Sequence, residues 1–224
     1  MTERPFIDWE WVGGHLDLIG QRLAQHVWLT VLAVGIGLLI ALPVSLYVQR
    51  RRRLYPVAAG FSGTLYTIPS IAFMGLLIPF TGLSTTTALV PLISYTLLIF
   101  VRNIVTGLDG VPEDTREAAL GMGYSVGQLR WRVEIPLALP AIVAGLRLAT
   151  VSTIGLVTIT ALIGKGGVGY LLLAGFRNLL PRTTAVTIGA VLSVAMAILA
   201  DAGLLRLQRA LAPWTRSVRS RTTG

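Results

Sequence analysis

The length of its uncharged apolar segments is the feature that most constrains this chain. Residues 27–48 contain no charged side chain, and neither do residues 57–101. A helix needs about 20 apolar residues to cross roughly 30 Å of hydrocarbon, so the first segment suffices for one membrane span and the second for two. Pro, Gly, Ser and Thr interrupt the second segment near residues 79–87, where a turn is expected. The sequence therefore predicts an integral membrane protein.

Five membrane-spanning helices account for the apolar segments. We predict them at residues 27–48, 57–79, 87–106, 137–163 and 183–205. Only 13% of the residues are charged, which is about half the share in a typical soluble domain, so the chain has too little charge to cover a surface in water. The predicted fold class is an all-α membrane protein with five transmembrane helices.

Residues 1–25 precede the first predicted span and do not resemble a cleavable signal peptide. They contain four acidic residues and no short apolar core followed by small residues. Tryptophans and apolar residues at helical spacing favour a short helix in the membrane interface, with an irregular polar leader as the alternative. His15 and His26 have no carboxylate or thiol cluster nearby, and the chain has no cysteine. We therefore expect neither metal ligands nor catalytic residues.

The basic residues predict the orientation, because cytoplasmic loops attract Lys and Arg. With the N-terminus outside and the C-terminus inside, 13 of the 19 basic residues fall on the cytoplasmic side. These are Arg50–Arg53, Arg102, Arg116, Arg130, Arg132, Arg206, Arg209, Arg216, Arg219 and Arg221. The outer segments receive Arg4, Arg22, Lys165, Arg177 and Arg182. The net charge of +9 is thus a topology signal that also favours contacts with lipid headgroups. No aromatic-interleaved basic face is present, which argues against nucleic-acid binding.

The longest cytoplasmic segment, residues 107–135, contains the strongest functional pattern. Pro112, Glu113 and Asp114 favour a helix start, because proline suits the first turn and acidic residues suit the positive end of the helix dipole. Gly121 and Gly123 are expected to end this helix, and a second short helix is expected over residues 124–133.

Small side chains on the first of these helices allow another protein to approach its backbone closely. They are Ala118, Ala119, Gly121 and Gly123, with the charge of Glu117 at their edge. A short, rigid helix of this kind suits docking into a groove on a partner. An ordinary amphipathic connector is the alternative that the residues leave open.

A spaced pattern in this segment resembles a family motif. It reads Glu117-Ala118-Ala119, three residues, Gly123, nine residues, Val133, one residue, Ile135-Pro136. This pattern is similar to the EAA loop of binding-protein-dependent ABC importer permeases, which has Ile and Leu where Val133 and Ile135 stand. The resemblance implies that Glu117–Gly123 acts as a coupling helix in a cleft of an ATPase subunit, with Val133 and Pro136 completing the motif.

The resemblance covers about residues 25–208. Residues 67–79, 133–151 and 161–169 look most like the subfamily that imports glycine betaine, choline, carnitine and related osmoprotectants, and less like methionine permeases. It implies a type I ABC importer permease domain over 26–208, between an extracytoplasmic segment (1–25) and a basic cytoplasmic tail (209–224). Implied partners are cytoplasmic ABC ATPase subunits that bind the ATP, a second permease copy and an extracytoplasmic solute-binding protein. The implied location is the bacterial plasma membrane, and this chain would need no cofactor.

Two polar features lie within the predicted spans. Arg147 and Asp201 fall at similar depths in the fourth and fifth spans, where an ion pair between them would lower the cost of burying their charges. Snorkelling of each side chain to the inner interface is the other possibility that the residues leave open. Thr150, Thr153 and Thr160 lie on one side of the fourth span and suit a pathway lining, although threonine hydroxyls also bond their own helix.

Rival functions follow from the same residues. One is a permease for methionine or another small solute. Another is a channel or scaffold without an ATPase. A membrane enzyme is disfavoured because no catalytic arrangement of side chains falls at a shared membrane depth.

Overall fold

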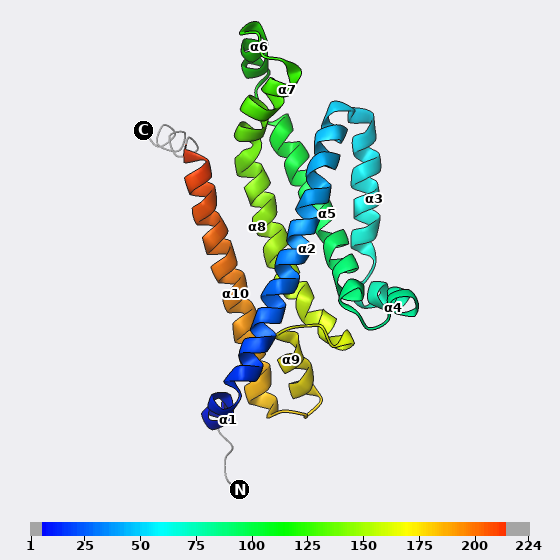
Figure 1. Ribbon diagram of the computed structural model, residues 1–224, viewed down its shortest axis with the longest axis vertical. Helices are drawn as coiled ribbons and strands as arrows, with labels where there is room; N and C mark the ends of the chain where they lie inside the picture. Colours follow the sequence, from blue (N-terminus) through cyan, green and yellow to red (C-terminus); the bar gives the residue numbers. More distant parts are fainter. Residues whose placement is uncertain (1–5, 214–224) are drawn as a thin grey trace.

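Helices make up all the regular structure in the computed structural model, which describes residues 6–213 (Figure 1). Four helices are long and apolar enough to cross a membrane, and a bent helix pair brings the number to five if it counts as one span. The prediction of an all-α membrane fold is therefore confirmed for the described residues. Arg4, Arg216, Arg219 and Arg221, and most of the predicted tail, lie outside them.

The first span is longer than predicted. Helix α2, Leu16–Arg50, runs without a break through the residues expected to form a separate interfacial helix. Only α1, Trp9–Gly14, is a separate short helix, and the Asp8 side chain caps it by accepting a hydrogen bond from the Trp11 backbone N–H at 2.9 Å. The predicted span over residues 27–48 is therefore part of α2, which begins eleven residues before it.

The second span differs from the straight helix expected over 57–79. It consists of α3, Tyr55–Thr67, and α4, Ser70–Thr81, which meet at an angle of 90° (Figure 1). Pro69 explains the break, because it has no N–H for the helix ladder and pushes the preceding residue out of the helical region. Ile68 accordingly has an extended backbone with ψ of 123°.

Helix α5, Thr85–Asp109, forms the centre of the bundle. Side chains four residues apart along one face of α5, Leu92, Thr96, Phe100, Ile104 and Leu108, are at most 1% exposed, and all but Thr96 are apolar. They pack against α2 on one side and α8, Ile135–Ile159, on the other. This four-residue spacing gives α5 a mostly apolar stripe.

The segment between α5 and α8 is more helical than the predicted 107–135 loop. Helix α6 spans Glu113–Gly121 and α7 spans Val126–Leu129. A π-helical turn, Arg130–Glu134, then joins α7 directly to α8, and a 3-10 turn, Thr160–Ile163, extends α8 at its far end. The expected second short helix is thus the extension of a membrane span beyond its predicted start at 137.

The chain ends with α9, Gly169–Phe176, and α10, Arg182–Leu211. Helix α10 packs on α8 and α9, but only 6% of its most apolar 18-residue window is buried within the protein. Most of its apolar surface is therefore available to lipid or to another subunit. The helix also crosses the predicted 208/209 boundary between domain and tail.

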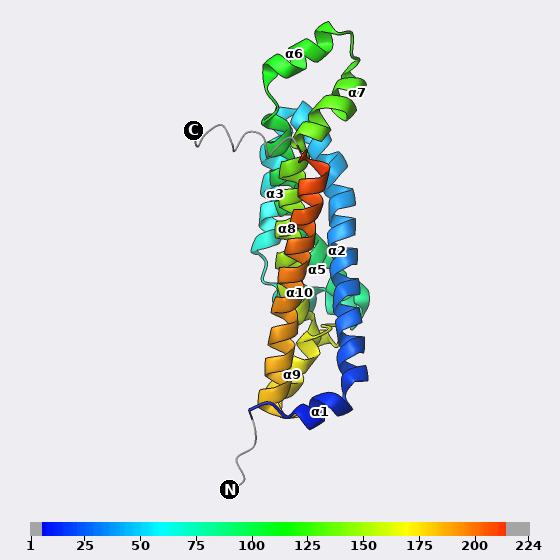
Figure 2. The same ribbon diagram turned by 90° about the vertical axis from the view of Figure 1, so that its left-hand side faces the viewer.

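The two ends of the bundle carry different elements (Figures 1 and 2). Helices α6 and α7, the α2–α3 connection and the end of α10 lie at one end, and α1 and α9 lie at the other. The described arginines assigned to the cytoplasm, including Arg50–Arg53 and Arg116, thus share one end of the molecule. The assignment of that end to the cytoplasm stays a prediction.

Close contact between α5 and α8 yields a testable prediction at Gly107. A Cβ atom added there would lie 2.7 Å from the Ala141 Cβ and 3.1 Å from the Ala138 carbonyl oxygen, neither of which can rotate away. We expect Gly107→Ala to lower the free energy of unfolding by about 1–2 kcal/mol, because overpacking forces the helices apart. Thermal unfolding in detergent measures this. Gly155→Ala is the matched control, since a Cβ there meets nothing within 4 Å; equal losses in both variants would contradict the prediction.

Candidate functional site: the projecting α6 helix and its anchor

Helix α6 projects beyond the end of the bundle (Figures 1 and 2). Pro112 precedes its first residue with ψ of 140°, and Glu113 and Asp114 occupy the first turn, where acidic side chains complement the helix dipole. The helix ends at Gly121, and Gly123 has a left-handed φ of 85°, which glycine adopts without strain. The sequence signals for the start and end of this helix therefore act where they were expected.

The structure separates the residues of the EAA pattern by exposure. Glu117, Ala118, Gly121 and Gly123 are exposed, whereas Ala119 is buried, so Ala119 packs inward and does not add to a docking surface. Val133 lies in the π-helical turn and Pro136 in the first turn of α8, away from the α6 tip. These two residues lie in the stem that supports the helix.

Exposed apolar side chains lie on α6 and in the segment that follows it, and the sequence did not predict a role for them. Leu120 is 49% exposed and Met122 is 70% exposed, and Val126 and Trp131 are similarly open. Their presence in a segment predicted to lie in the cytoplasm could have indicated an apolar surface for a partner. We call Glu117, Ala118, Leu120, Gly121 and Met122 the α6 tip. Its apolar character is typical of a surface that a protein partner covers.

A buried ionic network anchors the α6 helix to the bundle. The Arg116 Nε donates to Glu134 Oε1 at 3.0 Å, and the Arg116 Nη2 donates to the Leu108 carbonyl at 2.7 Å. The second Glu134 oxygen pairs with Arg130 Nε at 2.9 Å. Arg130 Nη2 in turn donates to the side chain of Gln49 at 2.9 Å. The network thus joins α6 to the ends of α5, α8 and α2.

Electrostatics favour the charged form of Arg116 at this position. Its Nη1 donates to Glu113 Oε2 at 2.8 Å. This hydrogen bond raises the pKa of the Arg116 guanidinium above its usual range, with further contributions from the charges of Glu134 and Glu113. The guanidinium is therefore a permanent cation that holds two carboxylates and a helix-end carbonyl together.

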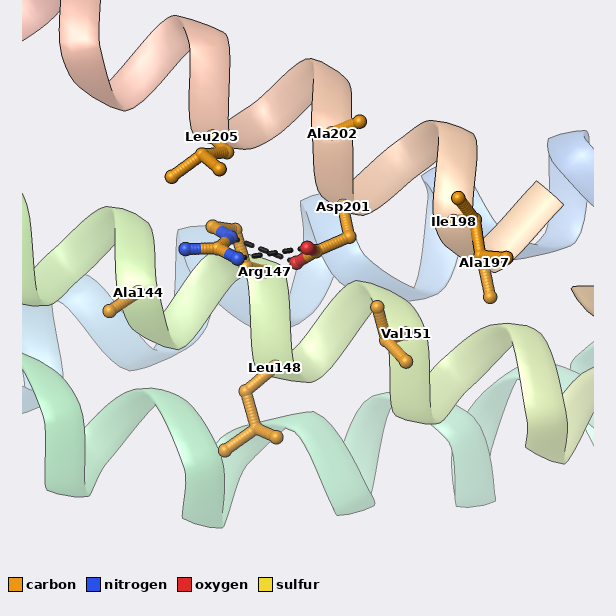
Figure 3. Close-up of a pocket in the computed structure, with 9 residues that line it drawn as sticks. All are labelled: Ala144, Arg147, Leu148, Val151, Ala197, Ile198, Asp201, Ala202 and Leu205. Carbon is orange, nitrogen blue, oxygen red and sulfur yellow. Dashed lines mark hydrogen bonds and ion pairs between the residues drawn. The ribbon is translucent and has the colours of Figure 1, made fainter. Parts of the chain in front are cut away.

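The structure brings Arg147 and Asp201 together between α8 and α10 (Figure 3). Arg147 Nε and Nη2 donate to the two Asp201 carboxylate oxygens, each at 2.8 Å. The pair lies in a groove of about 570 Å³ whose other lining residues are apolar. Gln208 lies on the same side of α10 and donates to the Pro140 carbonyl at 3.1 Å. These polar contacts connect α10 to α8.

The ion pair predicts a charge-swap result. We expect Arg147→Asp and Asp201→Arg each to lower the thermal unfolding temperature, because each leaves two like charges facing one another within the span. The double swap restores the bidentate pair and is expected to regain most of the loss. Unfolding temperatures of the three purified variants check this, and a double variant no more stable than the singles would contradict it.

Burial and own-helix hydrogen bonds describe the three threonines within the protomer, and their role in lining a pathway stays a prediction. Thr150 donates to the Leu146 carbonyl at 2.7 Å and Thr160 to the Val157 carbonyl at 2.8 Å. Thr153 and Thr160 are buried. Thr150 and Thr160 therefore bond their own helix, as threonine hydroxyls commonly do in helices. No group of three His, Asp or Glu side chains in residues 6–213 is arranged to hold a metal ion.

Comparison with known proteins identifies the family. Residues 33–217 match the family described as binding-protein-dependent transport system inner membrane component. The osmoprotectant import permease protein OsmW of Salmonella typhimurium is 42% identical, with 84% of this chain and 89% of the relative covered. The glycine betaine/carnitine/choline transport system permease protein OpuCB of Bacillus subtilis is 32% identical, with coverages of 86% and 88%. The expected resemblance to osmoprotectant permeases is confirmed by these relatives.

The fold has a counterpart among solved structures. A chain of the MetNI methionine ABC transporter in an inward facing conformation superposes with a TM-score of 0.77 at 24% identity, and 88% of this chain and 98% of that chain are covered. At this identity the match shows a shared fold and nothing about the solute. The family match over residues 33–217 shows that the chain belongs to the binding-protein-dependent transport system inner membrane component family.

Proposed function

We propose that this chain is the permease subunit of an ATP-driven importer for an osmoprotectant such as glycine betaine, choline or carnitine. The curated relatives at 32–42% identity are permeases of osmoprotectant, glycine betaine, carnitine and choline systems, which supports this solute class over methionine. The observation that carries the importer mechanism is the α6 tip, an exposed small and apolar surface at the end of a rigidly anchored helix. ATP is bound and hydrolysed by a separate subunit.

The proposed orientation places the α6 tip in the cytoplasm, the N-terminus outside and the C-terminus inside. The clustering of the described arginines at the α6 end of the bundle supports it, because basic residues collect on the cytoplasmic side. The opposite end, with α1 and α9, then faces the solute-binding protein outside. An ABC ATPase subunit binds the α6 tip through its exposed apolar and small residues.

A second permease copy, identical or homologous, completes the proposed transporter. The large unburied surface of α10 and the exposed break between α3 and α4 support a further subunit. Irregular backbone at membrane depth is tolerated only against protein or in a water-filled cavity. The solute pathway then lies between the two copies.

Reconstitution tests the proposed function. The permease is placed in proteoliposomes with its ATPase and solute-binding protein, and uptake and ATP hydrolysis are measured with glycine betaine, choline, carnitine and methionine. We expect at least one osmoprotectant to stimulate both uptake and hydrolysis. Stimulation by methionine alone would contradict the solute class, and uptake without ATP would contradict the ATP-driven mechanism.

A further inference from the structure

We propose that the break between α3 and α4 is a binding site for a quaternary ammonium group within the membrane. The break borders a cavity of about 220 Å³ that is lined by Tyr66, Tyr95, Leu156 and residues 67–70. This inference rests on the proposed function, because it assigns the place where the solute contacts the permease during transit.

The site lies about half-way along the predicted membrane-spanning length of the bundle. Thr67 follows the start of α3 by twelve residues and Tyr95 follows the start of α5 by ten. At 1.5 Å per residue these positions lie about 18 Å and 15 Å from the two ends of the span. The hydrocarbon layer is roughly 30 Å thick. Secondary transporters commonly bind solutes at this depth, where a helix is discontinuous.

Aromatic rings form one part of the site. The rings of Tyr66 and Tyr95 meet at 72° with their centroids 5.6 Å apart. Tyr95 is 4% exposed, whereas Tyr66 is 46% exposed and forms the open side. A quaternary ammonium group has no N–H to donate, so the faces of aromatic rings are its preferred partners in proteins. Because the two rings meet at 72°, a cation placed between them would contact a face of each ring.

Backbone carbonyls form the other part. The last four carbonyls of a helix have no backbone N–H partner within it, and Pro69, which follows α3, has no N–H that could bond them. The hydroxyl of Thr67 donates to the Thr64 carbonyl at 2.7 Å, and the hydroxyl of Tyr95 donates to the Ile68 carbonyl. The Tyr95 contact fixes the break and the ring together. The C-terminal end of α3 borders the cavity, so the negative end of its dipole favours a cation there.

The size and charge of the cavity suit a solute in transit. Pockets for drug-sized ligands measure roughly 300–1,000 Å³, so the smaller volume here fits a molecule of few heavy atoms. The residues that line the cavity carry no formal charge, so the attraction comes from ring faces and carbonyl dipoles alone. A solute held in this way binds weakly enough to leave again toward the cytoplasm.

Binding measurements test the site on the permease–ATPase complex in lipid nanodiscs, without the solute-binding protein. We expect radiolabelled choline to bind the unmodified complex. The uncharged analogue, in which a tert-butyl group replaces the trimethylammonium group, is expected not to displace it. Tyr66→Leu is expected to weaken choline binding about tenfold through loss of the ring face, and Tyr66→Phe is expected to keep it within about twofold. Phe61→Leu is the matched control, an exposed aromatic residue on the same helix outside the cavity.

Defined outcomes overturn the inference separately from the proposed function. Equal displacement by the uncharged analogue, or unchanged binding in Tyr66→Leu, would refute the cation site without any reliance on a misfolded variant. The same would follow if the reconstituted transporter imports choline or glycine betaine while the complex alone binds no choline. If the reconstituted transporter imports neither solute, the proposed function itself fails.

Discussion

Gly121→Trp is expected to weaken binding of the ATPase about 30-fold or more while the permease itself folds normally. A Cβ at Gly121 meets nothing within 4 Å, and the backbone there is not left-handed, so the protomer accommodates a large side chain in open space. The same side chain would stand on the α6 tip, where a partner must approach the backbone closely. The variant therefore tests ATPase binding without disturbing the folding of the permease.

The size of this effect follows from the position of Gly121 on the α6 tip. A residue at the centre of an interface changes the binding free energy by about 2 kcal/mol or more when the contact is lost, which corresponds to roughly a 30-fold rise in Kd. Titration of the purified ATPase onto permease in nanodiscs measures this. Solute-stimulated ATP hydrolysis is expected to fall with it.

Gly13→Trp is the matched control for this experiment. Gly13 also has open space around its Cβ position, and it lies in α1 at the opposite end of the bundle. We expect its ATPase affinity to equal that of the unmodified permease. An unchanged Kd in Gly121→Trp would show that the α6 tip is not the docking surface.

The membrane fold was predictable because long apolar segments are a local property of the sequence. The sequence indicated a break at Pro69 but not the angle of the bend. Proline signals an interruption, but the 90° angle also depends on Tyr95, which bonds the Ile68 carbonyl from 27 positions away. The unbroken helix from Val126 to Ile163 was hidden for a similar reason, since ion pairs with Arg116 and Arg130 hold Glu134 in the turn that joins its parts.

The candidate site was predictable to a comparable degree. Spacing and resemblance located α6 and its end, because Pro112, Gly121 and Gly123 act through local backbone geometry. The inward orientation of Ala119 and the exposure of Leu120 and Met122 depend on which face of α6 meets the bundle. That face is set by Arg116 and its distant partners, and no local pattern in the sequence specifies it.

Glu134→Gln is the second large effect that we expect. The Glu134 side chain is 7% exposed, and its two oxygens pair with Arg116 and Arg130. Removal of its charge leaves two guanidinium groups close together with no neutralising carboxylate between them. Breaking a buried pair costs about 3–5 kcal/mol, and we expect about 3 kcal/mol because the network lies at the end of the bundle near water. Thermal unfolding of the purified permease measures the loss.

The matched control for Glu134 is a carboxylate on the same arginine. Glu113 also pairs with Arg116, at 2.8 Å, but its side chain is 69% exposed. Exposed pairs contribute about 0–1 kcal/mol, so Glu113→Gln is expected to change stability little. Equal losses in the two variants would mean that Arg116 needs any neighbouring charge rather than the bridge to α8.

Glu134→Gln also separates ATPase binding from the coupling of ATP hydrolysis to solute import. Because Glu134 holds α6 to α8 but lies outside the α6 tip, we expect Glu134→Gln to retain ATPase binding and ATP hydrolysis while the solute imported per ATP falls. A loosened anchor lets α6 move without moving the spans, since the rigid connection between the two sites is lost. Uptake and hydrolysis measured in the same proteoliposomes give this ratio. An unchanged ratio in a folded Glu134→Gln permease would show that the network stabilises the loop but transmits nothing.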